Sequence, residues 1–269
     1  MKYYIAALGA IVLAGGLMTS LPASAQSAPS PVATPTPTVV IPPALPPIVK
    51  YVHYVSAGYI VPPIVCNELS PCNPGTRYRN VAVRSAVEFP IAGISLTGML
   101  KLDYRRYNYP AAGGSIALAG GGNAFAPALT AREEDYDFRA GVRALEPRLY
   151  LGVSYLRHTS NYGYPTMHGY GIGLEKLPDV DQIFSVYGGA YYYPNLRGEY
   201  TQPLGPNAGV PLQLAYHTLK YDMGITLKTS EHSPVFIDAG YLGDRSRNAD
   251  NAPSNITRNG PFVGLGINF

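Results

Sequence analysis

Alternating apolar and polar residues recur through most of the chain, and this period-two pattern restricts the possible folds more than any other feature. The segment over residues 92–107 has the cleanest pattern, with Leu100 and Leu102 on one face and Lys101 and Asp103 on the other. Successive side chains of a β-strand point to opposite faces of a sheet, so each such segment predicts a strand with one apolar face. Nine strands are predicted in this way, over residues 79–89, 92–107, 135–145, 147–158, 167–177, 182–193, 212–229, 233–246 and 259–269.

The overall composition favours a sheet whose two faces meet different surroundings. Hydrophobic residues make up 46% of the 269 residues, yet the mean hydropathy is only +0.01. A wall that alternates apolar and polar side chains gives such a near-zero average. No stretch after the first 25 residues approaches the roughly 18 consecutive apolar residues of a transmembrane helix. The formal net charge of +3 is too small to indicate a nucleic-acid partner.

Tyrosine is the dominant aromatic residue, with 23 tyrosines and no tryptophan. Aromatic side chains concentrate at the two membrane–water interfaces of transmembrane β-barrels. We therefore expect an aromatic girdle made of the tyrosines near predicted strand ends, with a sugar-binding surface as the alternative; these are Tyr104, Tyr107, Tyr109, Tyr191, Tyr192 and Tyr193.

The first 47 residues indicate export followed by a spacer. Residues 1–25 have the pattern of a secretory signal peptide, with Lys2, an apolar run and a small-residue cleavage site before Gln26. Residues 26–47 are rich in proline, which denies a sheet its N–H donors, so an extended tether is predicted there. Binding of this tether to peptidoglycan or a periplasmic partner is the alternative interpretation.

The last predicted strand ends on an aromatic residue and resembles the assembly signal of bacterial outer-membrane β-barrel proteins. One face of this strand carries four apolar residues: Val263, Leu265, Ile267 and Phe269. The resemblance implies that residues 48–269 form an all-β, closed antiparallel transmembrane barrel in the outer membrane of a Gram-negative-type envelope. It also implies two partners, the barrel assembly machinery and outer-membrane lipid.

The connections between predicted strands alternate between short and long, as in barrels with tight periplasmic turns and longer outside loops. The strand over 79–89 must then run inward from the outside, which requires an earlier outward strand, and residues 48–61 fit it. The prediction is therefore ten strands, with 48–61 paired to the last strand. Eight strands, or twelve with a strand hidden near Ile116–Leu118, are the alternatives. The long loops at 108–134 and 194–211 are the expected places of partner contact.

Cys66 and Cys72 are the only two cysteines and are separated by five residues. In an exported protein such a close pair predicts a disulfide. Two cysteines without nearby histidines cannot complete a zinc site, so no metal and no cofactor are expected.

The polar faces of the predicted strands carry many charges of both signs. Unpaired charges in a narrow lumen would be costly, so we expect cation–carboxylate pairs across strands that occlude it. A narrow, porin-like path for ions or small solutes is the alternative. The predicted lumen network consists of Arg84, Glu88, Lys101, Asp103, Arg105, Asp137, Arg139, Arg143, Lys220, Asp222 and Asp238.

His158-Thr159-Ser160-Asn161 is the sharpest local motif, and it resembles the His-x-Ser-Asn element of the outer-membrane lipid A 3-O-deacylase family. The resemblance implies that His158 acts as the general base and Ser160 as the nucleophile, with Glu175 orienting the histidine. An omptin-like protease is a further hypothesis. It would group acidic residues and histidines at the outer mouth: Glu133, Glu134, Asp135, His158, His168 and Asp244.

The sequence favours a structural or surface-interaction protein over an enzyme. The alternatives are a lipid A deacylase-like hydrolase and a narrow channel. The sequence does not identify a surface ligand.

Overall fold

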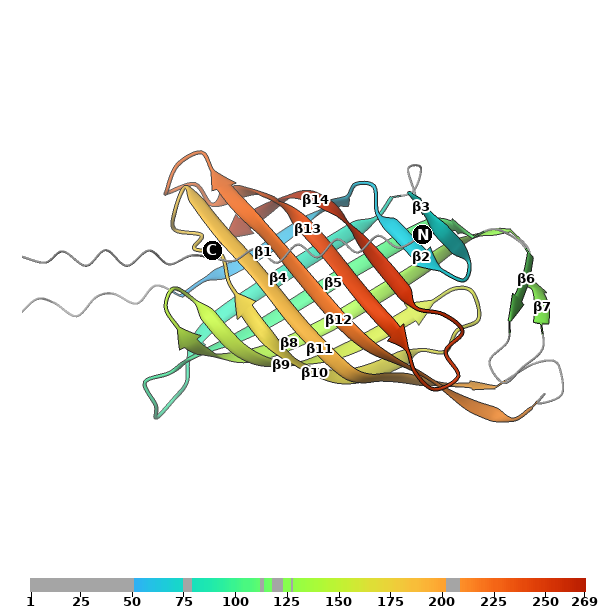
Figure 1. Ribbon diagram of the computed structural model, residues 1–269. Helices are drawn as coiled ribbons and strands as arrows, with labels where there is room; N and C mark the ends of the chain where they lie inside the picture. The colour runs from blue at the N-terminus through green and yellow to red at the C-terminus, as the bar shows by residue number, and fades with distance from the viewer. Residues whose placement is uncertain (1–50, 75–78, 112–113, 118–122, 127, 202–208) are drawn as a thin grey trace, which may run out of the picture. The chain divides into compact units, whose positions relative to one another are not determined.

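The computed structural model describes residues 51–74, 79–111, 114–117, 123–126, 128–201 and 209–269. Every regular element in this part of the chain is a β-strand (Figure 1). The predicted signal peptide and tether lie outside the described residues. Within these residues, no helix has the length and apolar character needed to cross a membrane.

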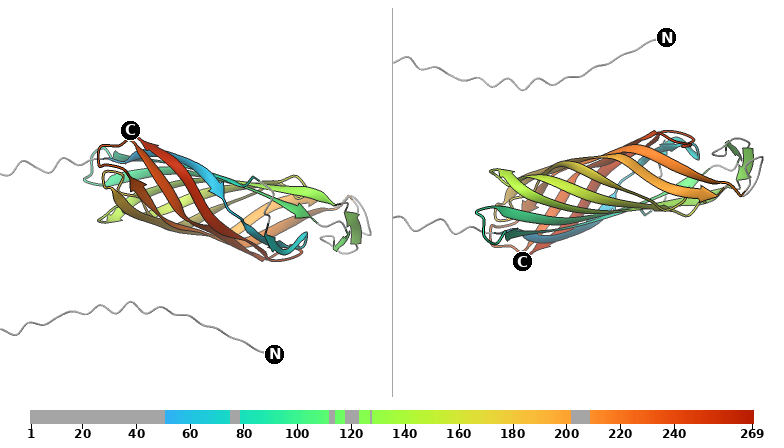
Figure 2. Two further views of the ribbon diagram at one scale, coloured as in Figure 1. Left: turned by 90° about the horizontal axis from the view of Figure 1, so that it is seen from above. Right: turned by 90° about the horizontal axis from the view of Figure 1, so that it is seen from below.

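The strands form one antiparallel sheet that closes on itself, so the all-β, antiparallel prediction is confirmed. Consecutive neighbours pair all the way round, and β1 pairs with β14 to complete the ring (Figures 1 and 2). The strands of the ring are β1 (His53–Ile60), β4 (Val81–Pro90), β5 (Thr97–Ala111), β8 (Leu129–Leu145), β9 (Leu149–Ser160), β10 (Met167–Lys176), β11 (Phe184–Thr201), β12 (Pro211–Lys228), β13 (Val235–Asn248) and β14 (Ile256–Asn268).

The closure between β1 and β14 follows the predicted pairing of the first and last strands. Tyr54 lies opposite Asn268, and Ile60 lies opposite Phe262. Gly58 and Gly264 face each other in this seam. A Cβ at Gly58 would lie 2.2 Å from the Val263 carbonyl oxygen, and a Cβ at Gly264 would lie 2.4 Å from that of Ala57. The glycines therefore let the two backbones approach closely where the ring closes.

Four short strands lie outside the ring. β2 (Ile64–Asn67) pairs with β14 beside β1, and β3 (Ser70–Pro74) pairs with β2 as a hairpin. β6 (Gly114–Ala117) and β7 (Asn123–Ala126) form a separate two-stranded sheet. Ile116, in the segment considered above as a hidden wall strand, therefore belongs to a hairpin within the β5–β8 connection, whereas Leu118 lies outside the described residues.

The two ends of the ring differ in their connections. At one end, which we call the turn end, the connections are residues 91–96, 146–148, 177–183 and 229–234. The opposite end, which we call the loop end, carries the β2–β3 hairpin and the strand ends between which residues 112–128, 161–166, 202–210 and 249–255 stand in the sequence. Several strands run further toward the loop end than predicted. The loops expected at 108–134 and 194–211 are therefore shorter, because β5, β8 and β11 extend into them.

The wall has an apolar outer face and a charged inner face. Along β14 and the residue that follows it, the row Val263, Leu265, Ile267 and Phe269 points outward, with exposed fractions of 50% to 75%. Inward residues are buried, and in the middle of the ring they are mostly charged, including Arg84, Arg105 and Arg139. This distribution inverts that of a water-soluble sheet protein, whose large apolar residues gather inside.

Only two of the six tyrosines predicted for the aromatic girdle lie on the outer face. Tyr104 and Tyr192 lie on the outer face, and Tyr192 is 46% exposed. The other predicted members point into the ring and are fully buried: Tyr107, Tyr109, Tyr191 and Tyr193. Period-two alternation places neighbours such as Tyr191 and Tyr192 on opposite faces, so a run of tyrosines cannot belong to one girdle.

Candidate functional site

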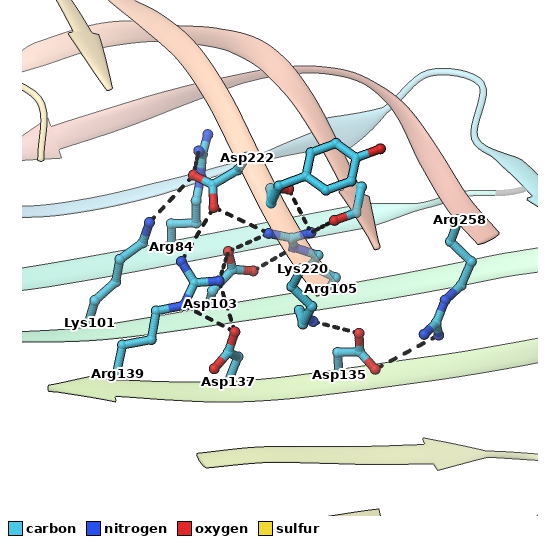
Figure 3. Close-up of polar contacts among 12 residues, drawn as sticks. Arg84, Lys101, Asp103, Arg105, Asp135, Asp137, Arg139, Lys220, Asp222 and Arg258 are labelled. Carbon is cyan, nitrogen blue, oxygen red and sulfur yellow. Dashed lines mark hydrogen bonds and ion pairs between the residues drawn. The ribbon is translucent and has the colours of Figure 1, made fainter. Parts of the chain in front are cut away.

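The interior of the ring is crossed by a network of ion pairs, which we treat as the candidate site (Figure 3). All residues of the predicted lumen network lie on the inner side of the wall and have charged or polar partners there. They separate into three groups along the ring. The central cluster is Arg84, Lys101, Asp103, Arg105, Asp137, Arg139, Glu175, Asp222 and Asp238.

Asp222 on β12 is the hub of the central cluster. Its carboxylate lies 3.3 Å from Arg139 and 3.4 Å from Arg105. It also lies 3.6 Å from Lys101 and 3.7 Å from Arg84. These four cations belong to β4, β5 and β8, which do not neighbour β12 in the ring. The contacts therefore run across the interior (Figure 3).

Each cation of the central cluster meets at least two carboxylates. Arg84 pairs with Asp238 at 2.6 Å in addition to Asp222, and Lys101 pairs with Glu175 at 2.7 Å. Arg139 contacts Asp137 at 2.8 Å and Glu175 at 2.7 Å. Desolvated charges are tolerated when such pairs and hydrogen bonds replace water.

Aromatic rings provide further contacts for the guanidinium groups. The Arg84 guanidinium carbon lies 4.6 Å from the centre of the Tyr187 ring and 4.5 Å from that of Phe262. That of Arg139 lies 4.4 Å from the centre of the Tyr191 ring. These are cation–π distances, and the contact with Arg139 accounts for the inward position of Tyr191, one of the tyrosines assigned to the girdle.

The turn-end group is centred on Glu88. Its carboxylate accepts hydrogen bonds from Tyr150, from Arg143 at 3.0 Å and from the Val52 amide at 2.7 Å. Leu177 and Val180, from the connection over 177–183, are 0% and 3% exposed and pack with an apolar cluster beneath this group. Part of this turn is therefore buried among inward-facing side chains at the turn end.

Asp179 anchors that turn through hydrogen bonds from Arg148 and from Lys176, the latter at 3.0 Å. Partial burial acts to raise the pKa of the Asp179 carboxyl, but the hydrogen bonds and charges of Lys176 and Arg148 outweigh it and lower the pKa. Asp179 is therefore an ionised link between the turn and the wall at neutral pH.

The loop-end cluster consists of Glu133, Asp135, His158, Lys220, Asp244 and Arg258. Asp135 contacts Lys220 at 2.6 Å and His158 Nδ1 at 2.7 Å. Arg258 contacts Glu133 at 2.5 Å and Asp244 at 2.7 Å. His158 Nε2 and one oxygen of Asp244 have no hydrogen-bond partner among the described residues. This cluster therefore retains hydrogen-bonding capacity.

The cysteine hairpin covers the loop-end cluster. Cys66 and Cys72 are joined as predicted, with Cα atoms 4.2 Å apart. Asn67 donates hydrogen bonds to Tyr109 at 2.6 Å and to Glu133 at 3.4 Å. Leu69 is 5% exposed and packs in an apolar cluster with Tyr109. The hairpin is thus bound to interior side chains at the loop end.

The deacylase-like arrangement is not assembled. Glu175, expected to orient His158, pairs instead with Lys101 and Arg139 in the central cluster. It lies opposite Tyr150 in the β9–β10 ladder, eight residues from His158 along β9, because the two strands are paired without a shift there. The carboxylate on His158 is Asp135. His158 is 1% exposed on the inner face, and no described contact joins it to Ser160.

The omptin-like grouping is also divided between faces. Glu133, Asp135, His158 and Asp244 are buried inside, whereas His168 points outward and Glu134 pairs with Arg106 on the outer side. Arg258 was missed by the sequence analysis altogether, because its strand was expected to begin at residue 259. The inward positions Arg258, Gly260 and Phe262 continue the alternation of β14, and that pattern was the available signal.

The described residues contain no group of three or more histidine, cysteine or acidic side chains arranged to hold a metal ion. Comparison with known proteins gives no family model that matches the chain and no curated protein that resembles it.

Proposed function

We propose that residues 48–269 form a ten-strand transmembrane β-barrel of a bacterial outer membrane, with a lumen closed by ion pairs. Its role is then structural or surface-interacting rather than catalytic. The single observation that supports this proposal most is the inverted wall. Large apolar side chains point outward all round the ring, while the Asp222 hub binds cations across the interior.

Insertion is the first property to test. Purified protein added to phosphatidylcholine vesicles should become resistant to protease along its strands and should migrate faster on an unboiled than on a boiled denaturing gel. Protein that stays in the aqueous phase with its exposed apolar wall aggregated would contradict the proposal.

Conductance distinguishes a closed barrel from the narrow-channel alternative. In planar bilayers the wild-type protein should show no steady channel current, because side chains of β4, β5, β8 and β12 meet in the middle of the ring. The double variant Arg139→Ala/Asp222→Ala removes two bridging side chains and should open measurable current. Arg106→Ala, on the outer face, is the matched control and should stay closed. Current through the wild type would favour the channel.

The hydrolase alternative predicts loss of an acyl chain from lipid A. We expect mass spectra of lipid A from cells with and without the protein to be the same, because His158 and Ser160 lie on the inner side of the wall and Glu175 is engaged elsewhere. A lost acyl chain that depends on Ser160 would overturn this assignment.

A further inference from the structure

Basic side chains that have no carboxylate partner among the described residues concentrate on the outer face at the loop end of neighbouring strands. They are Arg157 on β9, His168 on β10, Arg197 on β11, His217 on β12, and Arg245 and Arg247 on β13. Arg157 lies opposite His168, and His217 lies opposite Arg247. The outward residues at the turn end of these strands are mainly apolar, for example Phe184, Leu227 and Val235. The basic side chains of this face that lack a carboxylate partner among the described residues are therefore concentrated at one end.

Arg245 and Arg247 are the two members of this group that lie on the same strand. Within the described part of the chain, no carboxylate lies within ion-pair distance of either. Arg106 and Arg132, at the same end of the ring, instead contact Glu134 at 3.0 and 3.7 Å. Glu199, an outward carboxylate on β11, is two strands from β13. The two arginines therefore present positive charge that the described residues do not neutralise.

These arginines border a hollow in the outer face. Arg245 and Arg247, together with Tyr192, His217 and Leu219, line a space of about 320 Å³. His217 Nδ1 donates to the Pro194 carbonyl at 2.5 Å, which fixes the imidazole at the edge of this space. A hollow walled by two arginines and an aromatic ring is suited to an anionic group that is carried on an apolar body.

An apolar hollow of about 770 Å³ begins at the same Tyr192 and extends over β11, β10, β9 and β8. It arises because Ala140, a small outward residue, lies between the larger Leu100 and Val153 on the adjacent strands. Tyr170 and Ile172, which are 76% and 66% exposed, line it as well.

The two hollows follow one cross-strand row. The row runs, each residue opposite the next, through Leu100, Ala140, Val153, Ile172, Tyr192, Leu219 and Arg245. Leu100 is near the turn end of β5, whereas Arg245 is near the loop end of β13, so the row crosses the wall obliquely. At a strand spacing of about 4.8 Å, the three steps from Tyr192 to Ala140 span roughly 14 Å, which is about half of a hydrocarbon core of roughly 30 Å.

We propose that this row is a binding site for a phosphate-bearing lipid on the outer face of the wall. The phosphate binds Arg245 and Arg247, and one hydrocarbon chain lies over Tyr192, Ile172, Val153 and Ala140. The inference rests on the proposed membrane location. The lipid site would also make the two leaflets unequal for this protein, because it would bind anionic lipid only in the leaflet at the loop end.

Lipid pairs with the same chains and different headgroups test the site. Protein in an uncharged detergent is titrated with dioleoyl phosphatidic acid or dioleoylglycerol, and bound lipid is counted by native mass spectrometry. Phosphatidic acid should bind and dioleoylglycerol should not compete. Inorganic phosphate at millimolar concentration should not displace the lipid, because it lacks the chain. Equal binding of both lipids, or displacement by phosphate alone, would overturn the proposal.

Variants locate the two halves of the site. Arg245→Gln/Arg247→Gln should weaken phosphatidic acid binding about 30-fold. This estimate assigns to each arginine the binding free energy that one basic side chain contributes near an anionic lipid surface. Ala140→Phe places a larger outward side chain in the apolar hollow and should also weaken binding. Arg106→Gln/Arg132→Gln removes the same charge from the same end and should change affinity less than about twofold. An equal loss in this control would show a diffuse charge effect and refute the site.

The vesicle experiment separates this proposal from the membrane location on which it rests. Protein that inserts into phosphatidylcholine vesicles but binds both lipids alike refutes only the lipid site. Protein that fails to insert refutes the barrel.

Discussion

The two faces of the wall use charge in opposite ways. On the inner face, each cation of the central cluster lies within 4 Å of at least two carboxylates. On the outer face, charges are few, and Arg245 and Arg247 have no carboxylate partner among the described residues. Paired inner charges hold strands in place, whereas unpaired outer charges remain available for a ligand. The same residue type is therefore structural on one face and a recognition element on the other.

Loss of the hub should have the largest effect on the inner face. Asp222→Asn keeps the shape of the side chain but leaves four cations with one carboxylate fewer, and we expect a loss of about 3–5 kcal/mol in the free energy of unfolding. Urea unfolding in neutral micelles measures it. Glu199→Gln, an exposed outward carboxylate, is the control and should change stability by less than about 0.5 kcal/mol. A loss below about 1 kcal/mol for Asp222→Asn would indicate that water screens the interior.

A charge added to the outer face should cost nearly as much in a bilayer. Met223 is 59% exposed on β12, and Met223→Arg should lower stability by about 2–4 kcal/mol in vesicles, since a lipid-facing cation loses its hydration. Met223→Leu is the matched control and should be close to neutral. Unfolding titrations in phosphatidylcholine vesicles measure both. If Met223→Arg is as stable as Met223→Leu, this side chain faces water rather than lipid.

The hairpin over the loop-end cluster should depend on its disulfide. Replacing Cys66 and Cys72, six residues apart, with serine should lower local stability by up to about 2 kcal/mol through loop entropy. The amides of Leu69 and Ser70, which donate to Asn67 Oδ1 at 3.0 and 2.8 Å, should then exchange faster with deuterium. Central strands should be unaffected. Unchanged exchange at these two amides would show that Asn67 and Leu69 hold the hairpin without the disulfide.

The smallest effect concerns the turn closed by Asp179. The pKa of this carboxyl is lower in the folded protein than its ordinary value of 3.8. Its stabilising contribution is therefore full above about pH 4 and is lost as the pH falls through the folded pKa. We expect less than about 1 kcal/mol, because the side chain is 15% exposed and the pair is partly screened. Acid unfolding of the wild type and Asp179→Asn should differ above pH 4 and converge below the folded pKa.

The alternation of residues predicted the strands because each wall residue meets one of two different environments. It also predicted which side chains turn inward, including Lys101 and Asp103. Strand ends were less accessible, since residues 194–201 contain proline, asparagine and glycine and still continue β11 past a bulge near Tyr193. Pairings of side chains across the interior could not be predicted from the sequence. Asp222 meets Arg84 and Arg139 only because of strand tilt and ring size, and neither is encoded in local spacing.

The candidate catalytic residues show the same limit. His158 lies on the inner face, and the resemblance to the deacylase family assigned Glu175 to orient it. Asp135 is the carboxylate that His158 contacts, and it lies opposite His158 in the β8–β9 ladder. The carboxylate partner of His158 is therefore determined by the pairing of β8 with β9, and not by its distance from His158 along the sequence.

The glycine-lined seam between β1 and β14 has a consequence for how the protein is made. Among neighbours in the ring, β1 and β14 are far apart along the chain, whereas the other neighbours follow one another with only short elements between them. Local hairpins can form as soon as their residues are available, but the seam requires a contact between the first and last strands. Until it forms, both strands have unsatisfied backbone edges, which are sites of aggregation. Ring completion therefore requires the pairing with the largest separation along the chain, and it is the step at which an assembly factor would matter most.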